Sequence, residues 1–417
     1  MKTRITAKAL RKLVIQGVRS GPTVEPRCPH AIDCGGCAFQ DRAYDYQLTT
    51  KTTVLHQLFG FLADKITLDV ETITVKPSPD PYAYRTRMDY VTTKGRLGLR
   101  KSGRFQFIVE LETCHLLPPA AFQAVQAVWL QARELGLDDY NVRSHEGFLR
   151  YLVVRRSPQD TFLLAAVTAA GDAHQEMDAL AAIALAQPGV VSFHWLRNDS
   201  LSDVSFGVPV QHWGSATLPM ELVHPDDPEQ QMTLHIGPNT FFQNNVHLLW
   251  TLLDDVAEAA VGDRADSTTL QVIDLYSGVG AIAMYLSPHV AQMTCVESHT
   301  ESAALTRYNS SLNRLPVTVW ADDVQRFLQL QRRGQFDVAI VDPPRTGLGE
   351  RVCLELQRMA PQRIVYLSCN PITQLDDLQL LTASYQLTTL QGYDMFPHTP
   401  HVETLAVLDA NEDSGRY

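Results

Sequence analysis

A glycine-rich turn gives the first chemical signal in the sequence. It reads Asp274-Leu-Tyr-Ser-Gly278-Val-Gly280 and joins an apolar, strand-like run to a helix-like one. The two glycines let the backbone turn tightly and come close to a ligand, and the helix N-terminus offers free amide donors. Glu297 follows at the end of the next apolar run, where an acid can hydrogen-bond a ribose hydroxyl. The combination favours an adenosine-type cofactor over a plain strand–helix turn.

Two further apolar runs end in residues that can do chemistry. Asp342-Pro-Pro-Arg follows one of them, and its prolines leave a fixed loop because they cannot continue a helix. The alternative for this segment is a plain turn. Cys369 ends another run between small polar residues, where a cysteine faces the ligand-binding crevice and can act as a nucleophilic thiolate. Cys295 and Cys353 lie within apolar runs and are expected in the core.

A loop before the last strand-like run adds acid–base candidates. It contains His398, His401 and Glu403, and any of the three could serve as a general base. The alternative is a polar loop around a buried acid.

Four cysteines have the spacing of a metal site. Three fall within ten residues around a Gly-Gly pair and a fourth follows much later: Cys28, Cys34, Cys37 and Cys114. Four thiolates suit an iron–sulfur cluster or a structural Zn²⁺, and the uneven spacing fits a cubane better than paired zinc knuckles. Because His30 and His115 lie close to these cysteines in the sequence, a zinc site is one alternative. The other alternative is that the four cysteines are unrelated free thiols.

The pattern of apolar and polar runs along the chain predicts two folded parts. Over 27–235, short strand-like runs mix with helix-like stretches, which indicates an α+β domain after a basic tail at 1–26. A helix is expected over 41–63 and could pack on the second part. Over 236–417, apolar strands alternate with helices, which predicts an α/β domain with a mostly parallel, Rossmann-like sheet. Its strands are expected at 270–278, 291–298, 317–323, 336–344, 363–370, 385–397 and 401–408.

Charge is unevenly spread along the 417 residues, whose formal net charge is −11. Residues 1–30 and 84–104 each hold seven basic side chains and one acid, so these two segments sum to +12 and the rest to −23. Such segments are either solvated faces or nucleic-acid contacts. Because no run is long enough for a membrane span or has the form of a signal peptide, we expect a cytoplasmic protein without membrane contact. We also expect a monomer.

Together these motifs resemble those of the RNA uracil-5-methyltransferase family. The resemblance runs from Cys28 to Leu408 and rests on blocks in the family's order: Phe-Phe-Gln-Asn at 241–244, the glycine turn at 274–280, Asp-Pro-Pro-Arg at 342–345, Ser-Cys-Asn-Pro at 368–371 and Met-Phe-Pro-His-Thr-Pro-His-Val-Glu at 395–403. It implies a C-terminal class I methyltransferase domain that uses S-adenosylmethionine, joined to an α+β domain that carries a 4Fe-4S cluster.

The resemblance also implies roles for individual residues. Cys369 matches the nucleophile that adds to C6 of uracil, and Glu403 matches the base that removes the C5 proton. The cofactor contacts implied are Gln243, Tyr276, Gly278, Gly280, Glu297 and Asp342, and the cluster ligands are Cys28, Cys34, Cys37 and Cys114. A thiolate suits this chemistry because C5 of uracil is too weak a nucleophile to take a methyl group unaided. The target uridine must be flipped out of its RNA.

The implied substrate is 23S ribosomal RNA. Family members with the four cysteines act on large-subunit ribosomal RNA, and only 27 residues precede Cys28, too few for the TRAM barrel of one ribosomal branch. The chain therefore resembles a cluster-containing branch without that barrel, although Asp342 stands where this branch often has Asn. The basic tail could replace part of the barrel. The alternatives are a tRNA 5-methyluridine methyltransferase and a non-catalytic iron–sulfur or zinc protein that binds RNA.

Overall fold

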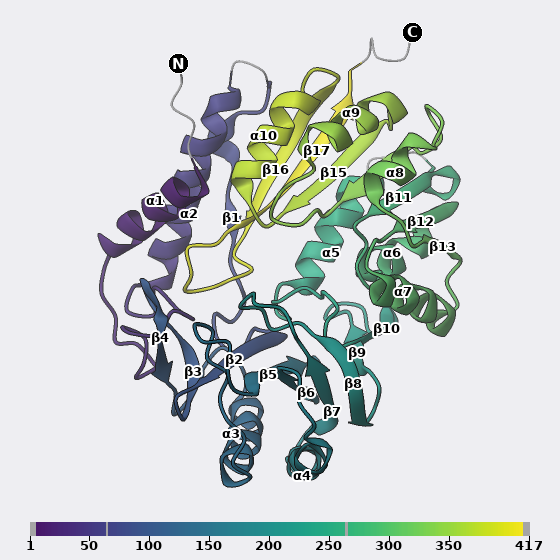
Figure 1. The fold of residues 1–417 in the computed structure, drawn as a ribbon. Coiled ribbons are helices and arrows are strands. Elements are labelled where there is room, and N and C mark those ends of the chain that lie inside the picture. The colour runs from purple at the N-terminus through teal and green to yellow at the C-terminus, as the bar shows by residue number, and fades with distance from the viewer. Residues whose placement is uncertain (1–5, 64–65, 263–265, 412–417) are drawn as a thin grey trace.

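The computed structural model describes residues 6–63, 66–262 and 266–411 and contains three β-sheets (Figure 1). Eight strands form one sheet, seven form a second, and β9 (Leu218–Val223) and β10 (Gln231–Ile236) form an antiparallel ribbon. In the view of Figure 1, the eight-stranded sheet lies above the seven-stranded sheet.

The eight-stranded sheet is built mainly from the C-terminal part of the chain. Its order is β1-β16-β17-β15-β14-β11-β12-β13, and all neighbours are parallel except for the two pairs that include β17. The strands are β1 (Val75–Lys76), β11 (Gln271–Leu275), β12 (Gln292–Val296), β13 (Val317–Trp320), β14 (Val338–Val341), β15 (Arg363–Ser368), β16 (Tyr385–Tyr393) and β17 (Glu403–Ala410). The seven strands after β1 overlap the predicted strand runs, which confirms the predicted alternation of strands and helices after residue 236.

Helices cover both faces of this sheet because each parallel pair needs a crossover connection. One face carries α8 (Val324–Gln329), α9 (Gly349–Met359) and α10 (Pro371–Leu381), and the other α5 (Leu249–Ala257), α6 (Ala281–Leu286) and α7 (Thr300–Asn313). Short helical turns lie at Gly60–Leu62, Val70–Thr72, Glu258–Gly262, Ser267–Thr269 and Ser287–His289. No helix in the described part of the chain is long and apolar enough to cross a membrane.

The seven-stranded sheet has the order β4-β3-β2-β5-β6-β7-β8 and is antiparallel except where β6 and β7 pair through the crossover helix α4 (His174–Leu185). With α4, helix α3 (Pro119–Glu134) packs on one face, and both helices lie in the part of the chain, 27–235, where helix-like stretches between strands are expected. The strands are β2 (Arg87–Thr93), β3 (Arg96–Lys101), β4 (Arg104–Glu110), β5 (Leu149–Arg156), β6 (Phe162–Thr168), β7 (Val190–Arg197) and β8 (Val208–Gly214).

The N-terminal segment differs from the predicted basic tail. It forms helix α1 (Ala7–Arg19), because Leu10, Val14 and Val18 recur every four residues and bury one face. Helix α2 (Tyr44–Phe59) confirms the helix expected over 41–63, and its apolar side chains join the core cluster that includes α9, α10 and β16. The domain boundaries at 26 and 235 remain predictions, although α1, α2 and β1 all lie with the C-terminal sheet.

The loop 394–402, which leads into β17, is fastened by N-terminal segments. Lys51 Nζ donates to Asp394 Oδ1 at 2.5 Å, and both side chains are fully buried. The backbone N–H groups of Ala38 and Phe39 donate to the carbonyl of His398 at 2.7 and 3.1 Å. These contacts fix the direction in which the chain enters β17.

Replacing Lys51 with Met should destabilise the protein by about 3–5 kcal/mol, because it leaves the Asp394 carboxylate buried without its counter-charge. Arg326→Ala is the matched control, since Arg326 is 75% exposed and 3.6 Å from Asp322, and it should change stability by less than about 1 kcal/mol. Urea unfolding followed by circular dichroism measures both values. Equal losses in the two variants would contradict a structural role for the buried pair.

Candidate active site

Strand pairing brings Cys369 and Glu403 to the same place. Ser368, the last residue of β15, pairs with Thr404 of the antiparallel strand β17. The next position on each strand puts Cys369 opposite Glu403 at the carboxyl edge of the parallel strands. Asp342 directly follows β14, the other neighbour of β15, and reaches the same edge.

The charges at this edge act on one another. Burial raises the pKa of Glu403 to about 8, and the charge of Asp342 adds to the rise while the guanidinium of Arg345 opposes it. Burial also raises the pKa of the Cys369 thiol to about 11, with further increases from Glu403 and Asp342. Arg345 hydrogen-bonds the sulfur and lowers that pKa. The exposed Arg345 is therefore the group that favours a thiolate here.

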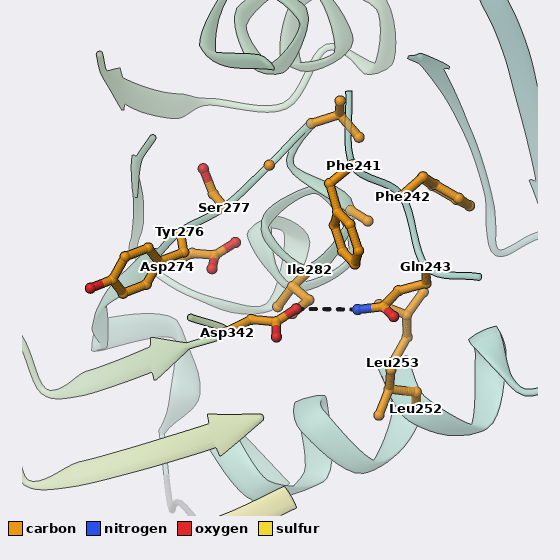
Figure 2. A pocket seen from close by; sticks show the side chains of 13 residues that line it. Phe241, Phe242, Gln243, Leu252, Leu253, Asp274, Tyr276, Ser277, Ile282 and Asp342 are labelled. Atoms are coloured by element: carbon orange, nitrogen blue, oxygen red, sulfur yellow. Dashed lines mark hydrogen bonds between the residues drawn. The ribbon is translucent and has the colours of Figure 1, made fainter. Parts of the chain in front are cut away.

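A pocket lies beside this edge, under the glycine-rich turn (Figure 2). Gln243 Nε2 donates to Asp342 Oδ2 at 3.2 Å across its floor. Burial raises the pKa of Asp342 to about 7, and the bond from Gln243 opposes the rise. Of the residues predicted to touch the cofactor, those that line the pocket are Gln243, Tyr276, Gly278 and Asp342.

Gly280 and Glu297 lie next to the pocket and shape its rim. Gly280 has φ +87° and caps α6, and a Cβ there would come within 2.8 Å of the Thr306 side chain. Glu297 accepts the N–H of Gly278 at 2.9 Å and the N–H of His299 at 2.7 Å. In this structure its carboxylate therefore holds the glycine turn in place.

Asp274 belongs to the pocket, although we had not singled it out as a cofactor contact. Its side chain is buried and lines the pocket, and neither carboxylate oxygen accepts a hydrogen bond of ordinary geometry in the described structure. Burial and the charges of Asp342 and Glu297 raise its pKa well above the usual range. A buried acid without a partner favours a ligand that carries positive charge. Phe241, 56% exposed, is a second lining residue missed from sequence.

The four predicted metal-ligating cysteines line a single pocket elsewhere in the protein: Cys28, Cys34, Cys37 and Cys114. Each is 6–7% exposed. Burial raises the pKa of Cys34 to about 11 and that of Cys37 to about 12, and neighbouring thiols in the pocket add to both rises. Two sulfurs accept hydrogen bonds, Cys34 from Gly36 N at 3.4 Å and Cys37 from Gln40 Nε2 at 3.2 Å.

No group of three or more His, Cys, Asp or Glu side chains within the described ranges is placed to hold a metal ion. The predicted 4Fe-4S site is therefore not shown by the geometry. His115 borders the cysteine pocket, whereas His30 Nε2 accepts the backbone N–H of Glu112 at 3.1 Å. Cys295 and Cys353 are fully buried in the core, as predicted.

Neither histidine of the loop is suited to gain a proton at neutral pH. Burial lowers the pKa of His398 to about 4 and that of His401 to about 3, and nearby cations lower both further. His398 Nδ1 also lies 3.2 Å from Gln47 Nε2. Of the three candidates for a general base, Glu403 alone lies opposite the cysteine.

Several basic residues in the segment 84–104 are engaged within the protein, among them Arg85 and Arg87. Arg85 lies over the rings of Tyr84 and Phe396, 5.8 and 5.6 Å from their centroids. Arg87 donates to Asp89 Oδ1 and to the carbonyl of Pro238, each at 2.8 Å. These contacts give both residues a structural role that the sequence did not reveal.

Cys369 should react slowly with iodoacetamide, because its raised pKa leaves little thiolate. At pH 8 we expect a rate about 100-fold below that of the same cysteine in urea, given a pKa about two units higher. Arg345→Gln should slow the reaction further and Glu403→Gln should speed it, as measured by mass spectrometry of the labelled peptide. Changes of the same sign in the two variants would show that access, not charge, controls the rate.

Comparison with known proteins relates the chain to enzymes that modify RNA. The profile of the tRNA (Uracil-5-)-methyltransferase family matches residues 227–411. A tRNA (uracil(54)-C(5))-methyltransferase of Pyrococcus abyssi is 33% identical over 393 residues, which cover 94% of this chain and 88% of the relative. An uncharacterized RNA methyltransferase of Thermotoga maritima is 31% identical over 390 residues, covering 92% and 84%.

A solved structure agrees with these sequence matches. The crystal structure of the Pyrococcus abyssi tRNA (uracil-54, C5)-methyltransferase in complex with S-adenosyl-L-homocysteine superposes with a TM-score of 0.73 at 31% identity. The match covers 90% of this chain and 86% of the other. On this similarity over almost its whole length, the chain belongs to the RNA uracil-5-methyltransferase family.

Proposed function

We propose that the protein transfers a methyl group from S-adenosylmethionine to C5 of a uridine in RNA. The observation that carries this proposal is the placement of Cys369 opposite Glu403, next to the pocket under the glycine turn. A thiol, a carboxylate and a cofactor pocket at one sheet edge are the groups that C5 methylation of uracil requires.

The pocket is suited to S-adenosylmethionine on chemical grounds. The cofactor carries a positively charged sulfonium and an ammonium group, and the pocket offers Asp342 and the unpartnered Asp274. Phe241 and Ile282 supply apolar walls, and the turn at Gly278 lets the backbone approach closely. A relative solved with S-adenosyl-L-homocysteine supports the same assignment. The bound cofactor would supply the methyl group.

In the proposed reaction, the Cys369 thiolate adds to C6 of the uracil, and electrons move onto C5 and the C4 carbonyl. Arg345 stabilises the thiolate that starts the step. S-adenosylmethionine held beside Gln243 and Asp342 would supply the methyl group to this nucleophilic C5 and would leave as S-adenosyl-L-homocysteine. The Glu403 carboxylate takes the proton from C5, the bond between C6 and sulfur breaks, and Cys369 leaves as a thiolate. Glu403 is left with the proton from C5, which must pass to solvent before the next turnover.

Transfer RNA is the substrate that the comparisons support best. The relatives of known specificity are named as methylating uracil 54 of tRNA, so that position is the first to test. The 23S ribosomal RNA expected from the four cysteines has less support, because those relatives are not ribosomal enzymes by name. Unmodified transcripts of both RNAs belong in the same assay.

We also propose that the four cysteines hold a 4Fe-4S cluster. They share one pocket with apolar walls, including Leu99 and Leu111, yet they do not converge on one point as ligands of a single ion must. A four-iron cluster takes one thiolate at each iron, which fits four separated thiols better than Zn²⁺ does. The hydrogen bonds to Cys34 and Cys37 are of the kind that tune such clusters. We assign it a structural role.

Two variants test the methyl-transfer proposal. Cys369→Ala should abolish methylation of the transcript, because it removes the thiol that adds to C6, while RNA binding persists. Glu403→Gln should trap the cysteine–uridine adduct as a protein–RNA band that resists denaturation, because the C5 proton cannot leave. Transfer of radiolabelled methyl and denaturing gels measure these outcomes. Methylation by the Cys369→Ala protein would contradict the proposed nucleophile.

Iron analysis tests the cluster. Protein purified without oxygen should contain about four iron and four sulfide per chain and should absorb broadly in the visible range. Cys114→Ser should lose the iron, whereas Cys369→Ser, which changes a thiol outside the pocket, should retain it. A colourless wild-type protein with one bound zinc would overturn the assignment.

A further inference from the structure

The seven-stranded sheet carries a second cavity, which the proposed methyl transfer does not use. It measures about 650 Å³ and is lined by residues of β2, β3, β4 and β5 and of the segment 140–143. Val91, Ile108 and Tyr151 line it and belong to the face of the sheet opposite α3, since Met88 and Tyr90 pack on the α3 side. The cavity is of the size that binds organic ligands.

The cavity is strongly basic. Its walls contain five cationic side chains and one acid, which are Lys94, Arg96, Arg100, Arg143, Arg150 and Asp203. Asp203 is not free to neutralise the other cations, because it pairs with Arg100 and accepts a hydrogen bond from the hydroxyl of Tyr151. Within the described residues, Lys94 and Arg143 have no acidic partner, and the exposed Arg96 faces Glu110 only at 3.9 Å. A surplus of positive charge in a concave site favours phosphate groups.

Aromatic side chains lie among these cations. Phe107 lines the cavity and is 51% exposed, and Phe105 on the same strand is 60% exposed. Tyr140 stacks under the guanidinium of Arg150, whose carbon lies 4.3 Å from the ring centroid. Cations that follow a backbone, together with exposed rings on which bases stack, are the features of single-stranded nucleic-acid sites.

The cavity and the cofactor pocket are joined by strand β2. At the start of that strand, Thr86 Oγ1 donates to the carbonyl of Gln243 at 2.9 Å, next to the cofactor pocket. At its end, Thr93 lines the basic cavity. The strand therefore separates the two sites by about 20 Å. Phe206, 50% exposed, lies on Arg87 between them, with the guanidinium carbon 4.6 Å from the ring centroid.

We propose that this cavity, lined by residues of 91–108 and 140–151 together with Asp203, binds an unpaired segment of the RNA substrate away from the target uridine. A base stacks on Phe107, and phosphates contact Lys94, Arg96 and Arg143. The inference rests on the proposed function, because it takes RNA as the substrate. It assigns the cavity to RNA affinity and leaves the chemistry at Cys369 unchanged.

Filter binding of the full-length protein to unmodified transcripts of tRNA and 23S ribosomal RNA tests the proposal. Phe107→Ala should weaken binding of the substrate transcript about tenfold, because one stacked base is lost. The double variant Arg96→Ala, Arg143→Ala should lower the slope of log affinity against log salt by about two, one for each phosphate contact. Both changes should raise KM for RNA and leave kcat unchanged.

Two controls remove an aromatic ring or a charge elsewhere. Tyr308→Ala removes a ring that is 50% exposed on α7, and Arg326→Ala removes an exposed charge on α8. Neither should change affinity or salt slope. Binding constants unchanged by both the Phe107 and the double arginine variants would overturn the inference. Wild-type protein that binds the transcripts without methylating them would instead contradict the proposed function. The binding measurements would still test the cavity, because they do not depend on methylation.

Discussion

The antiparallel pairing of β17 with β15 is the constraint on which the candidate site depends. All other neighbouring strands from β11 to β15 are parallel, so their carboxyl ends meet at one edge. A parallel β17 would place its first residue at the opposite edge. Because β17 runs the other way, Glu403 at its start lies across from Cys369 at the end of β15.

That pairing in turn requires the loop 394–402 to reach the edge in one conformation. The buried pair of Lys51 and Asp394 holds one end, and the backbone of Ala38 and Phe39 holds the carbonyl of His398. A cluster held by Cys37 would stabilise the segment next to these donors. The cysteine pocket is thus connected to the site by backbone contacts, which fits the structural role proposed for a cluster there.

The proposed site of methyl transfer and the proposed RNA-binding cavity lie on different sheets. Two acids, Asp342 and Asp274, line the cofactor pocket. Burial raises the pKa of both, and a cationic cofactor beside them would favour their ionised form. Cationic side chains outnumber acids instead on the seven-stranded sheet, around the cavity that Phe107 lines. On the proposed function, this separation would let a chain with a net charge of −11 bind RNA through one local basic surface.

The sequence by itself determined the residue types, the strand runs and the family, because glycine turns, proline pairs and apolar periodicity act over a few neighbouring residues. Tertiary structure alone decided which groups meet. From the sequence, Asp274 is only a residue of a strand, whereas in the structure it lines the cofactor pocket. Arg87 likewise looks like a free cation in the sequence, but in the structure it donates hydrogen bonds to Asp89 and to the carbonyl of Pro238. Burial, register and partners depend on segments far apart in the chain, so local patterns could not reveal them.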